Sequence, residues 1–159
     1  MSTSMSGTMV FSKMLIAVDG SPCSENAAKK GIELASVLQI PAALFSVIDR
    51  SQEIIPSDLE VKPIQTGTFL EDQANSTIRL IIEKYVPRSM EDRIHPVLTE
   101  GLPREEILRK LKNWGADILV VGTHGRKGLA HFLLGSTAEY LVRHAKVPVL
   151  VIPFEGPDI

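Results

Sequence analysis

The chain has 159 residues, of which 44% are hydrophobic and 23% are charged, and its net charge is −2. This is the composition of one ordinary globular domain, and the intermixed charges lack the basic stripe typical of nucleic-acid-binding proteins. A single cysteine excludes an intramolecular disulfide, and no apolar run reaches the roughly 18 residues of a membrane span, so we expect a cytoplasmic protein without nucleic-acid or membrane partners.

The N-terminal third contains two short apolar runs separated by a segment of helical character. Met14–Val18 and Ala42–Ile48 are nearly continuous apolar stretches, which is typical of strands buried on both faces. Between them, Ser21 and Pro22 suit an N-cap and a first helical position. The sequence therefore predicts a helix from this point to about Leu38.

The middle of the chain predicts two helices and a weaker strand. Apolar residues at spacings of three and four mark the inward face of the first helix: Leu70, Ala74, Ile78, Ile81 and Tyr85. The strand, Ile94–Glu100, fits a sheet edge because Pro96 cannot donate to a ladder. The second helix opens at Pro103 and is closed by Gly115. Its predicted inward residues are Ile107, Leu111 and Trp114.

The C-terminal part predicts a strand, a short helix and a final strand. The strands are Asp117–Gly122 and Val147–Ile152, and the helix is Ser136–His144. The helix begins with a capping-box pattern, in which Ser136 is the cap and Glu139 reaches back to it.

Strands and helices alternate along the whole chain, which predicts a single α/β domain with an open, parallel, Rossmann-like sheet of five strands covered by helices on both faces. We place the domain at residues 12–155, between flexible tails at 1–11 and 156–159. Residues 49–68 show no clear period and form a loop longer than most connections. This loop is either a plain surface segment or a lid or partner contact near the site.

Two strand exits are polar and glycine-rich, namely Asp19–Ser21 and Gly122–Gly125. In open parallel sheets, ligands bind outside the carboxyl ends of the strands, where the strand order reverses. If the first and fourth strands are neighbours, the binding crevice lies between these exits.

The glycines of the second exit suit an anion site. Gly122 ends a strand where a side chain would obstruct a ligand, and Gly125 can adopt positive φ and turn N–H groups toward one point. Gly135 and Ser136 open a helix whose free N–H groups favour an anion. The alternative is that the glycines only build turns and Ser136 only caps its own helix. Residue types and spacing leave both readings open.

Neither a P-loop nor a dinucleotide fingerprint is present, and no G-x-S-x-G elbow supports Asp19, Ser21 and His124 as a hydrolytic triad. The pattern G-x2-G-x9-G-[ST] within ILVVGTHGRKGLAHFLLGSTAEYLVRHAKVPVLVIP instead resembles the universal stress protein family. The opening KMLIAVDGSPCSENAAKKGIELA resembles the first strand and helix of that family. The resemblance covers residues 12–153 and is weakest at 49–68.

This resemblance implies the adenine nucleotide α-hydrolase-like fold, with strand order 3-2-1-4-5, and the ATP-binding branch of the family, which keeps all the glycines. By position, Asp19 faces the ribose and phosphates, with Mg²⁺ as a candidate ion between them. Ala17 lines the pocket, and Val47 contacts adenine through its backbone.

The resemblance also implies two walls around the phosphates and ribose. The first wall consists of Val121, Gly122, His124 and Gly125. The second wall consists of Gly135, Ser136 and Thr137. Arg126 and Lys127 are added from their charge and not from the motif.

The resulting hypothesis is a nucleotide-dependent stress-response or regulatory module that binds ATP or AMP. The alternatives are a nucleotide-independent, chaperone-like scaffold and a slow ATPase; no residue stands out as a general base, so weak hydrolysis is the most catalysis we expect. The last strand has an apolar edge, and the family resemblance implies a homodimer through it, with Val147, Val149 and Val151 at the contact.

Overall fold

The computed structural model describes residues 11–52, 66–124 and 134–154. Within these ranges, no helix is both long enough and apolar enough to span a membrane. Phe11, which we predicted to belong to the flexible tail, packs against the core. Residues 1–10 and 155–159 lie outside the described ranges.

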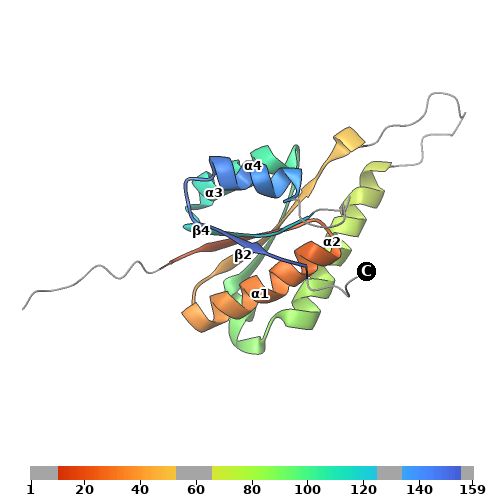
Figure 1. The fold of residues 1–159 in the computed structure, drawn as a ribbon. Helices are drawn as coiled ribbons and strands as arrows, with labels where there is room; N and C mark the ends of the chain where they lie inside the picture. The colour runs from red at the N-terminus through yellow and green to blue at the C-terminus, as the bar shows by residue number, and fades with distance from the viewer. Residues whose placement is uncertain (1–10, 53–65, 125–133, 155–159) are drawn as a thin grey trace, which may run out of the picture.

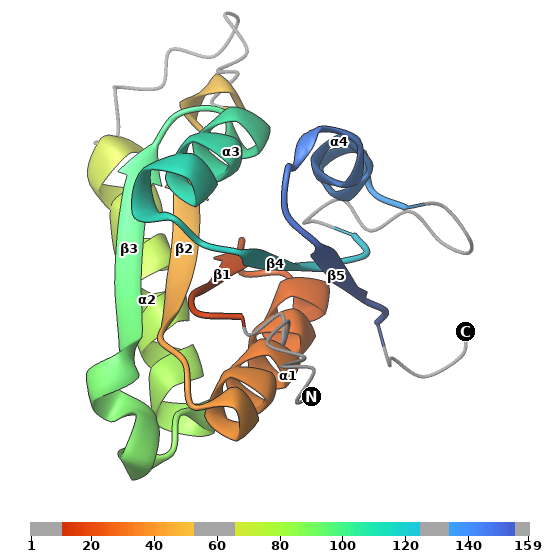
Figure 2. The ribbon, with the colours of Figure 1, turned by 90° about the vertical axis from the view of Figure 1, so that its left-hand side faces the viewer.

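Five parallel strands form one sheet in the order β3-β2-β1-β4-β5, which confirms the predicted order (Figure 2). The strands are β1 (Met14–Val18), β2 (Ala42–Ile48), β3 (Ile94–Glu100), β4 (Ile118–Gly122) and β5 (Val149–Ile152). The inner strands are buried on both faces, as their continuous apolar runs predict.

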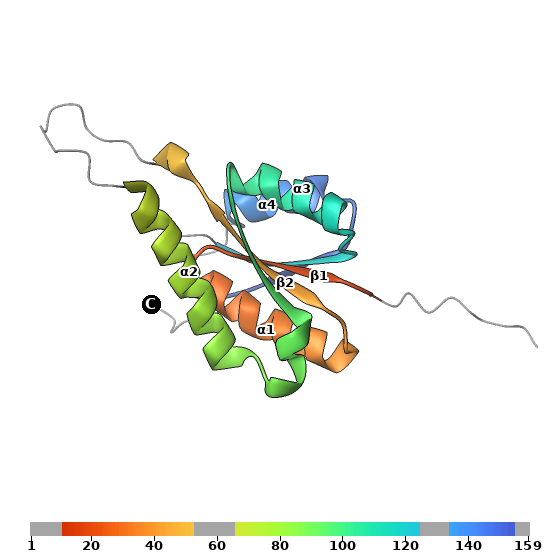
Figure 3. The ribbon, with the colours of Figure 1, turned by 180° about the vertical axis from the view of Figure 1, so that it is seen from behind.

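Helices cover both faces of the sheet (Figure 1). One face carries α1 (Pro22–Leu38) and α2 (Thr66–Tyr85), which lie side by side when the molecule is seen from behind (Figure 3). The other face carries α3 (Pro103–Trp114) and α4 (Ser136–His144). Each face has its own apolar cluster, since alternate strand residues point to opposite sides.

Helix α1 begins and ends as its sequence predicts. The hydroxyl oxygen of Ser21 accepts a hydrogen bond from the Ser24 N–H at 3.1 Å, and Pro22 occupies the first turn. Its cap at the other end is Gln39, in the left-handed region at φ 55°. This start directs the first turn of α1 toward the carboxyl ends of β1 and β4.

Two predicted strand starts are wrong by one or two residues. Strand β4 begins at Ile118, and the carboxylate of Asp117 just before it accepts hydrogen bonds from the Ser12 and Lys13 backbone. Strand β5 begins at Val149 and not at Val147, with the Pro148 carbonyl accepting from the Leu119 N–H at 3.0 Å.

The predicted cap of α4 is also wrong. Its N-cap is Gly135, and Ser136 is already the first helical residue. Glu139 does not reach back to the cap; its carboxylate pairs with Arg143 at 2.8 Å. The predicted loop 49–68 has helical structure at both ends, since Arg50–Gln52 is a 3₁₀ turn (η1) and α2 begins at Thr66.

A candidate nucleotide site at the carboxyl edge of the sheet

The ladder between β1 and β4 stops before either strand ends. Its register pairs Met14–Ile16 with Ile118–Val120, so the last two residues of each strand have no partner across this ladder. The strand order reverses at this same place, because β2 and β3 lie on one side of β1 while β4 and β5 lie on the other. The crevice therefore opens where the sequence predicted a ligand site.

Gly122 allows the first turn of α1 to approach the end of β4. A Cβ at this position would lie 2.8 Å from the Cys23 carbonyl oxygen and 2.9 Å from its carbon. Backbone atoms inside a helix cannot move aside cheaply, so the absence of a side chain is a packing requirement. We predicted Gly122 from ligand approach alone and missed this contact.

The crevice contains a cavity of about 610 Å³. It is lined by all of the predicted site residues that the structure describes: Ala17, Asp19, Val47, Val121, Gly122, His124, Gly135, Ser136 and Thr137. Gly125, Arg126 and Lys127 lie outside the described residues. The structure thus gathers residues from three strands and the start of α4 around one space.

The two predicted walls meet through one backbone contact. The Gly135 N–H donates to the Thr123 carbonyl at 2.6 Å, which joins the end of β4 to the start of α4. Among the described residues no side chain caps α4, and its first intrahelical bond runs from the Glu139 N–H to the Gly135 carbonyl. The N–H groups of residues 136–138 therefore have no helical partner, and these residues line the cavity.

Asp19 is fixed by the turn between β1 and α1. Its Oδ1 accepts from the Ser21 N–H at 2.9 Å, and its own N–H donates to the Ser24 hydroxyl at 3.1 Å. Ser21 is only 4% exposed, and its hydroxyl oxygen caps α1. Ser21 therefore has a structural role, which argues against the triad of Asp19, Ser21 and His124.

The Val47 carbonyl points toward the crevice. Carbonyls alternate along a strand, and that of Ile48 accepts from the Gly101 N–H on the β3 side, so that of Val47 faces the β1 side. Strand β1 has already ended there, because its last residue, Val18, pairs with Ser46. Among the described residues, no backbone N–H donates to this carbonyl, which leaves it available to a ligand in the cavity.

His124 follows the end of β4 by two residues and lines the cavity. Its Nδ1 lies 3.0 Å from the Thr123 hydroxyl oxygen. Its Nε2 is buried and has no hydrogen-bond partner among the described residues. Buried polar atoms are rarely left unpaired, so this atom is notable.

The model of the universal stress protein family matches residues 11–153. This chain belongs to the universal stress protein family. A relative from Methanocaldococcus jannaschii, universal stress protein MJ0531, is 31% identical over 147 residues, which are 92% of this chain and 84% of the relative.

Solved universal stress proteins share the fold at lower identity. UspA from Lactobacillus plantarum is 20% identical with a TM-score of 0.67, covering 89% of this chain and 97% of its own. A family protein from Arabidopsis thaliana with AMP bound is 15% identical with a TM-score of 0.62, covering 91% and 93%. The protein from Archaeoglobus fulgidus in complex with dAMP is 18% identical with a TM-score of 0.57, covering 91% and 99%.

In this universal stress protein, sequence reasoning missed most of the apolar lining of the cavity. That lining includes Phe45, Leu70, Ala74, Ile107 and Leu141. Most were predicted as inward-facing residues of their strands and helices, but inward-facing residues near the carboxyl ends of strands also floor the crevice. Their position near the carboxyl ends of the strands was the sequence signal that could have identified them as cavity residues.

The acidic groups of the lining do not form a metal centre by themselves. Among the described residues, no three His, Cys, Asp or Glu side chains gather closely enough to hold an ion. Asp19 and Asp49 both line the cavity. An ion such as Mg²⁺, which usually takes only one or two carboxylates, would need phosphate oxygens from the ligand.

Proposed function

We propose that this universal stress protein binds an adenine nucleotide, ATP or AMP, in the cavity, and that the bound nucleotide regulates its contacts with other proteins. The observation that carries the proposal is the gathering of nine predicted residues around one cavity beside the uncapped start of α4. The AMP and dAMP complexes of solved relatives support it.

The phosphates belong at the start of α4. Three N–H groups without helical partners and the positive end of the helix dipole favour an anion there. Where Mg²⁺ accompanies the nucleotide, Asp19 is the residue we propose to hold it together with the phosphates. The ion would neutralise part of the phosphate charge. We propose that the nucleotide acts as a regulatory ligand and that the protein hydrolyses it slowly at most.

The base belongs on the apolar floor beside β2. Phe45 and Ile107 offer apolar surface to a purine ring, and the Val47 carbonyl accepts from its amino group. Adenine presents an amino donor at this edge, whereas guanine presents a carbonyl oxygen that would face another carbonyl. We expect GTP to bind about 10- to 100-fold more weakly than ATP, the penalty for an unsatisfied buried polar pair.

Calorimetric titration with ATP, AMP and GTP tests this proposal. Ala17→Leu adds bulk to a residue that lines the cavity, and we expect it to remove nucleotide binding while the protein still melts cooperatively. Ser76→Leu is the matched control, because Ser76 is exposed on α2 and does not line the cavity. Equal binding by the wild type and both variants would refute the site, and a native mass spectrum would reveal nucleotide that copurifies.

A further inference from the structure

Trp114, the last residue of α3, is surrounded by basic side chains from different parts of the chain. The Lys13 Nζ lies 5.6 Å from the centre of the Trp114 ring, and the Lys110 Nζ lies 6.0 Å from it. The His95 ring stands nearly perpendicular to that of Trp114, with the two ring centres 6.1 Å apart. We call these four residues the Trp114 cluster.

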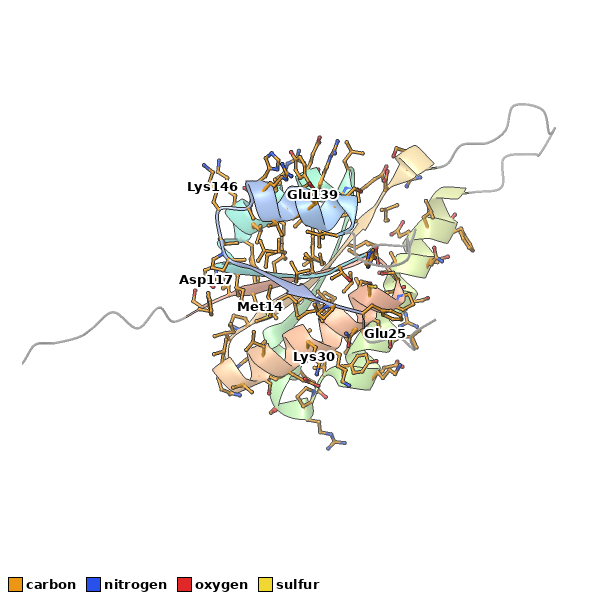
Figure 4. All side chains as sticks on the ribbon, viewed as in Figure 1. Met14, Glu25, Lys30, Asp117, Glu139 and Lys146 are labelled. Atoms are coloured by element: carbon orange, nitrogen blue, oxygen red, sulfur yellow. The ribbon has the colours of Figure 1, made fainter. Side chains whose placement is uncertain are left out.

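The Trp114 cluster lies at the amino end of the sheet, opposite the nucleotide cavity. Lys13 directly precedes β1, His95 is near the start of β3, and Trp114 lies shortly before β4. Because the strands are parallel, these positions meet at the same edge. Lys146, which follows α4, lies at the same end of the molecule as Asp117 and adds positive charge there (Figure 4). No residue of the cluster lines the described cavity.

The lysines of the Trp114 cluster carry charges that no carboxylate neutralises among the described residues. The ion pairs of the described ranges involve other side chains, such as Arg109 with Glu106 on α3. Asp117 is near in the fold, but its carboxylate accepts from the backbone of Ser12 and Lys13. The cluster therefore presents positive charge around an aromatic ring.

Part of this arrangement serves the fold. The Lys13 Nζ donates to the Trp114 carbonyl at 3.2 Å, which satisfies a carbonyl at the end of α3. Lysine stems also pack well on aromatic rings. Stability does not require the rest, since Lys110 is in no described ion pair and Trp114 stays partly exposed. Tryptophan residues at a surface often contribute much of the binding energy of a protein interface.

We propose that the Trp114 cluster binds an acidic segment of a partner protein. The carboxylates of the segment would pair with Lys13 and Lys110, and its apolar side chains would cover Trp114. A nucleic acid fits less well, because the chain has a net charge of −2 and the cluster is compact, unlike a basic stripe that follows a phosphate backbone. Since the cavity is at the other end of the sheet, the partner and a nucleotide can be bound together.

Trp114 is the only tryptophan of the chain, so its fluorescence reports directly on this surface. The probe is a short synthetic peptide of glutamates with interspersed leucines, and the matched peptide has glutamine in place of glutamate. Lys110→Glu is the test variant. Lys29→Glu is its charge-matched control, because Lys29 is exposed on α1 and is in no described ion pair. Titrations without nucleotide keep the result separate from the nucleotide site.

We expect the glutamate peptide to change the Trp114 emission and the glutamine peptide to leave it unchanged. Lys110→Glu should weaken binding about tenfold, because it replaces an attraction by a repulsion of similar size. Lys110→Gln should show a smaller loss, Lys29→Glu should bind like the wild type, and added salt should weaken binding. Thermal melting checks that each variant is folded.

The proposal would be overturned by a wild type that ignores the glutamate peptide or binds both peptides equally. Equal losses in Lys110→Glu and Lys29→Glu would also overturn it, because they would show an effect of net charge and not of this surface. A Trp114 emission that responds only to a single-stranded oligonucleotide, or only to anionic lipid vesicles, would replace the acidic protein segment by a nucleic acid or a membrane surface.

Discussion

Gly122 shows how one residue serves both packing and the site. A Cβ there would meet the Cys23 backbone in the first turn of α1, at 2.8 Å from its carbonyl oxygen. A Cβ at Gly31 would meet only side-chain atoms, the Cδ1 and Cγ1 of Ile16 at 2.8 Å and 3.0 Å and the Cγ1 of Val120 at 3.4 Å. Side-chain atoms can shift more readily than helix backbone, and alanine also favours the interior of a helix.

We therefore expect Gly122→Ala to lower the free energy of unfolding by about 1–3 kcal/mol, the usual cost of overpacking. Gly31→Ala is the control and should cost clearly less, because the Ile16 side chain can move. Urea denaturation of both variants without nucleotide makes the comparison. Equal decreases in the free energy of unfolding would mean that the backbone of α1 shifts at Gly122 as readily as side chains shift at Gly31.

Asp117 fastens the chain entering β1 to the start of β4, at the amino end of the sheet (Figure 4). Its carboxylate accepts from the N–H and hydroxyl of Ser12, at 2.8 Å and 2.7 Å, and from the Lys13 N–H at 3.1 Å. Burial acts to raise the pKa of Asp117, but the hydrogen bonds from Ser12 and Lys13 outweigh it and hold the pKa below its ordinary value.

Because the folded-state pKa is the lower one, this contribution to stability is present above the unfolded-state pKa of about 3.9 and is lost as the pH falls through the folded-state pKa. We expect Asp117→Asn to destabilise the protein by about 1 kcal/mol at pH 7, the value of a hydrogen bond lost. The difference in the free energy of unfolding between the wild type and Asp117→Asn, measured by urea denaturation, should become smaller below about pH 4. A difference in the free energy of unfolding that stays the same from about pH 7 to below about pH 4 would contradict this role of Asp117.

Helix starts show where an element departs from its sequence pattern. Ser21 and Ser136 both look like caps in the sequence, yet only Ser21 acts as one, since Ser136 is already the first residue of α4. Gly135, whose N–H donates to the Thr123 carbonyl, is the cap at φ −58° and ψ 151°, so α4 starts one residue earlier than the capping-box pattern indicates. The local pattern contains no information about that tertiary contact.

The two serines give a paired prediction. Ser21→Ala should lower the free energy of unfolding by about 1–2 kcal/mol, because it removes a buried cap. Ser136→Ala should change it by less than about 0.5 kcal/mol, as expected for an exposed residue whose side chain makes no cap bond. Urea denaturation without nucleotide compares them. A larger loss for Ser136→Ala would restore the sequence-based assignment.

Hydrophobic periodicity was enough to predict the five strands and four α-helices of the described residues. Each buried strand is a nearly continuous apolar run, and each helix has apolar residues at spacings of three and four on the face that meets the sheet. The strand order came from the family resemblance and is confirmed. The cavity floor was harder to predict, since Phe45 and Ile107 look like any core residues until the sheet places them at its carboxyl edge. That His124 Nε2 is buried without a hydrogen-bond partner among the described residues could not be predicted either, because burial of a single atom has no sequence signature.

At the scale of the whole molecule, the two edges of the sheet differ. Strand β3 has Pro96 within its length, which hinders pairing with another strand. Strand β5 is paired only with β4 in the described sheet, so its other side has no partner strand among the described residues. Val149 and Val151, predicted at a dimer contact, pack partly into the cluster beneath α4, as does Val147. The exposed apolar side chain of β5 is Leu150, at 37%.

We propose that two copies pair along β5, which would hydrogen-bond the free edge and bury Leu150. Leu150→Lys should therefore yield a monomer, because a charged residue on an edge strand opposes pairing. Leu80→Lys is the control, since Leu80 is 63% exposed on α2, away from that edge. Light scattering coupled to size exclusion measures both masses at tens of micromolar protein. A wild type of monomer mass, or a dimer that persists in Leu150→Lys, would exclude assembly through this strand.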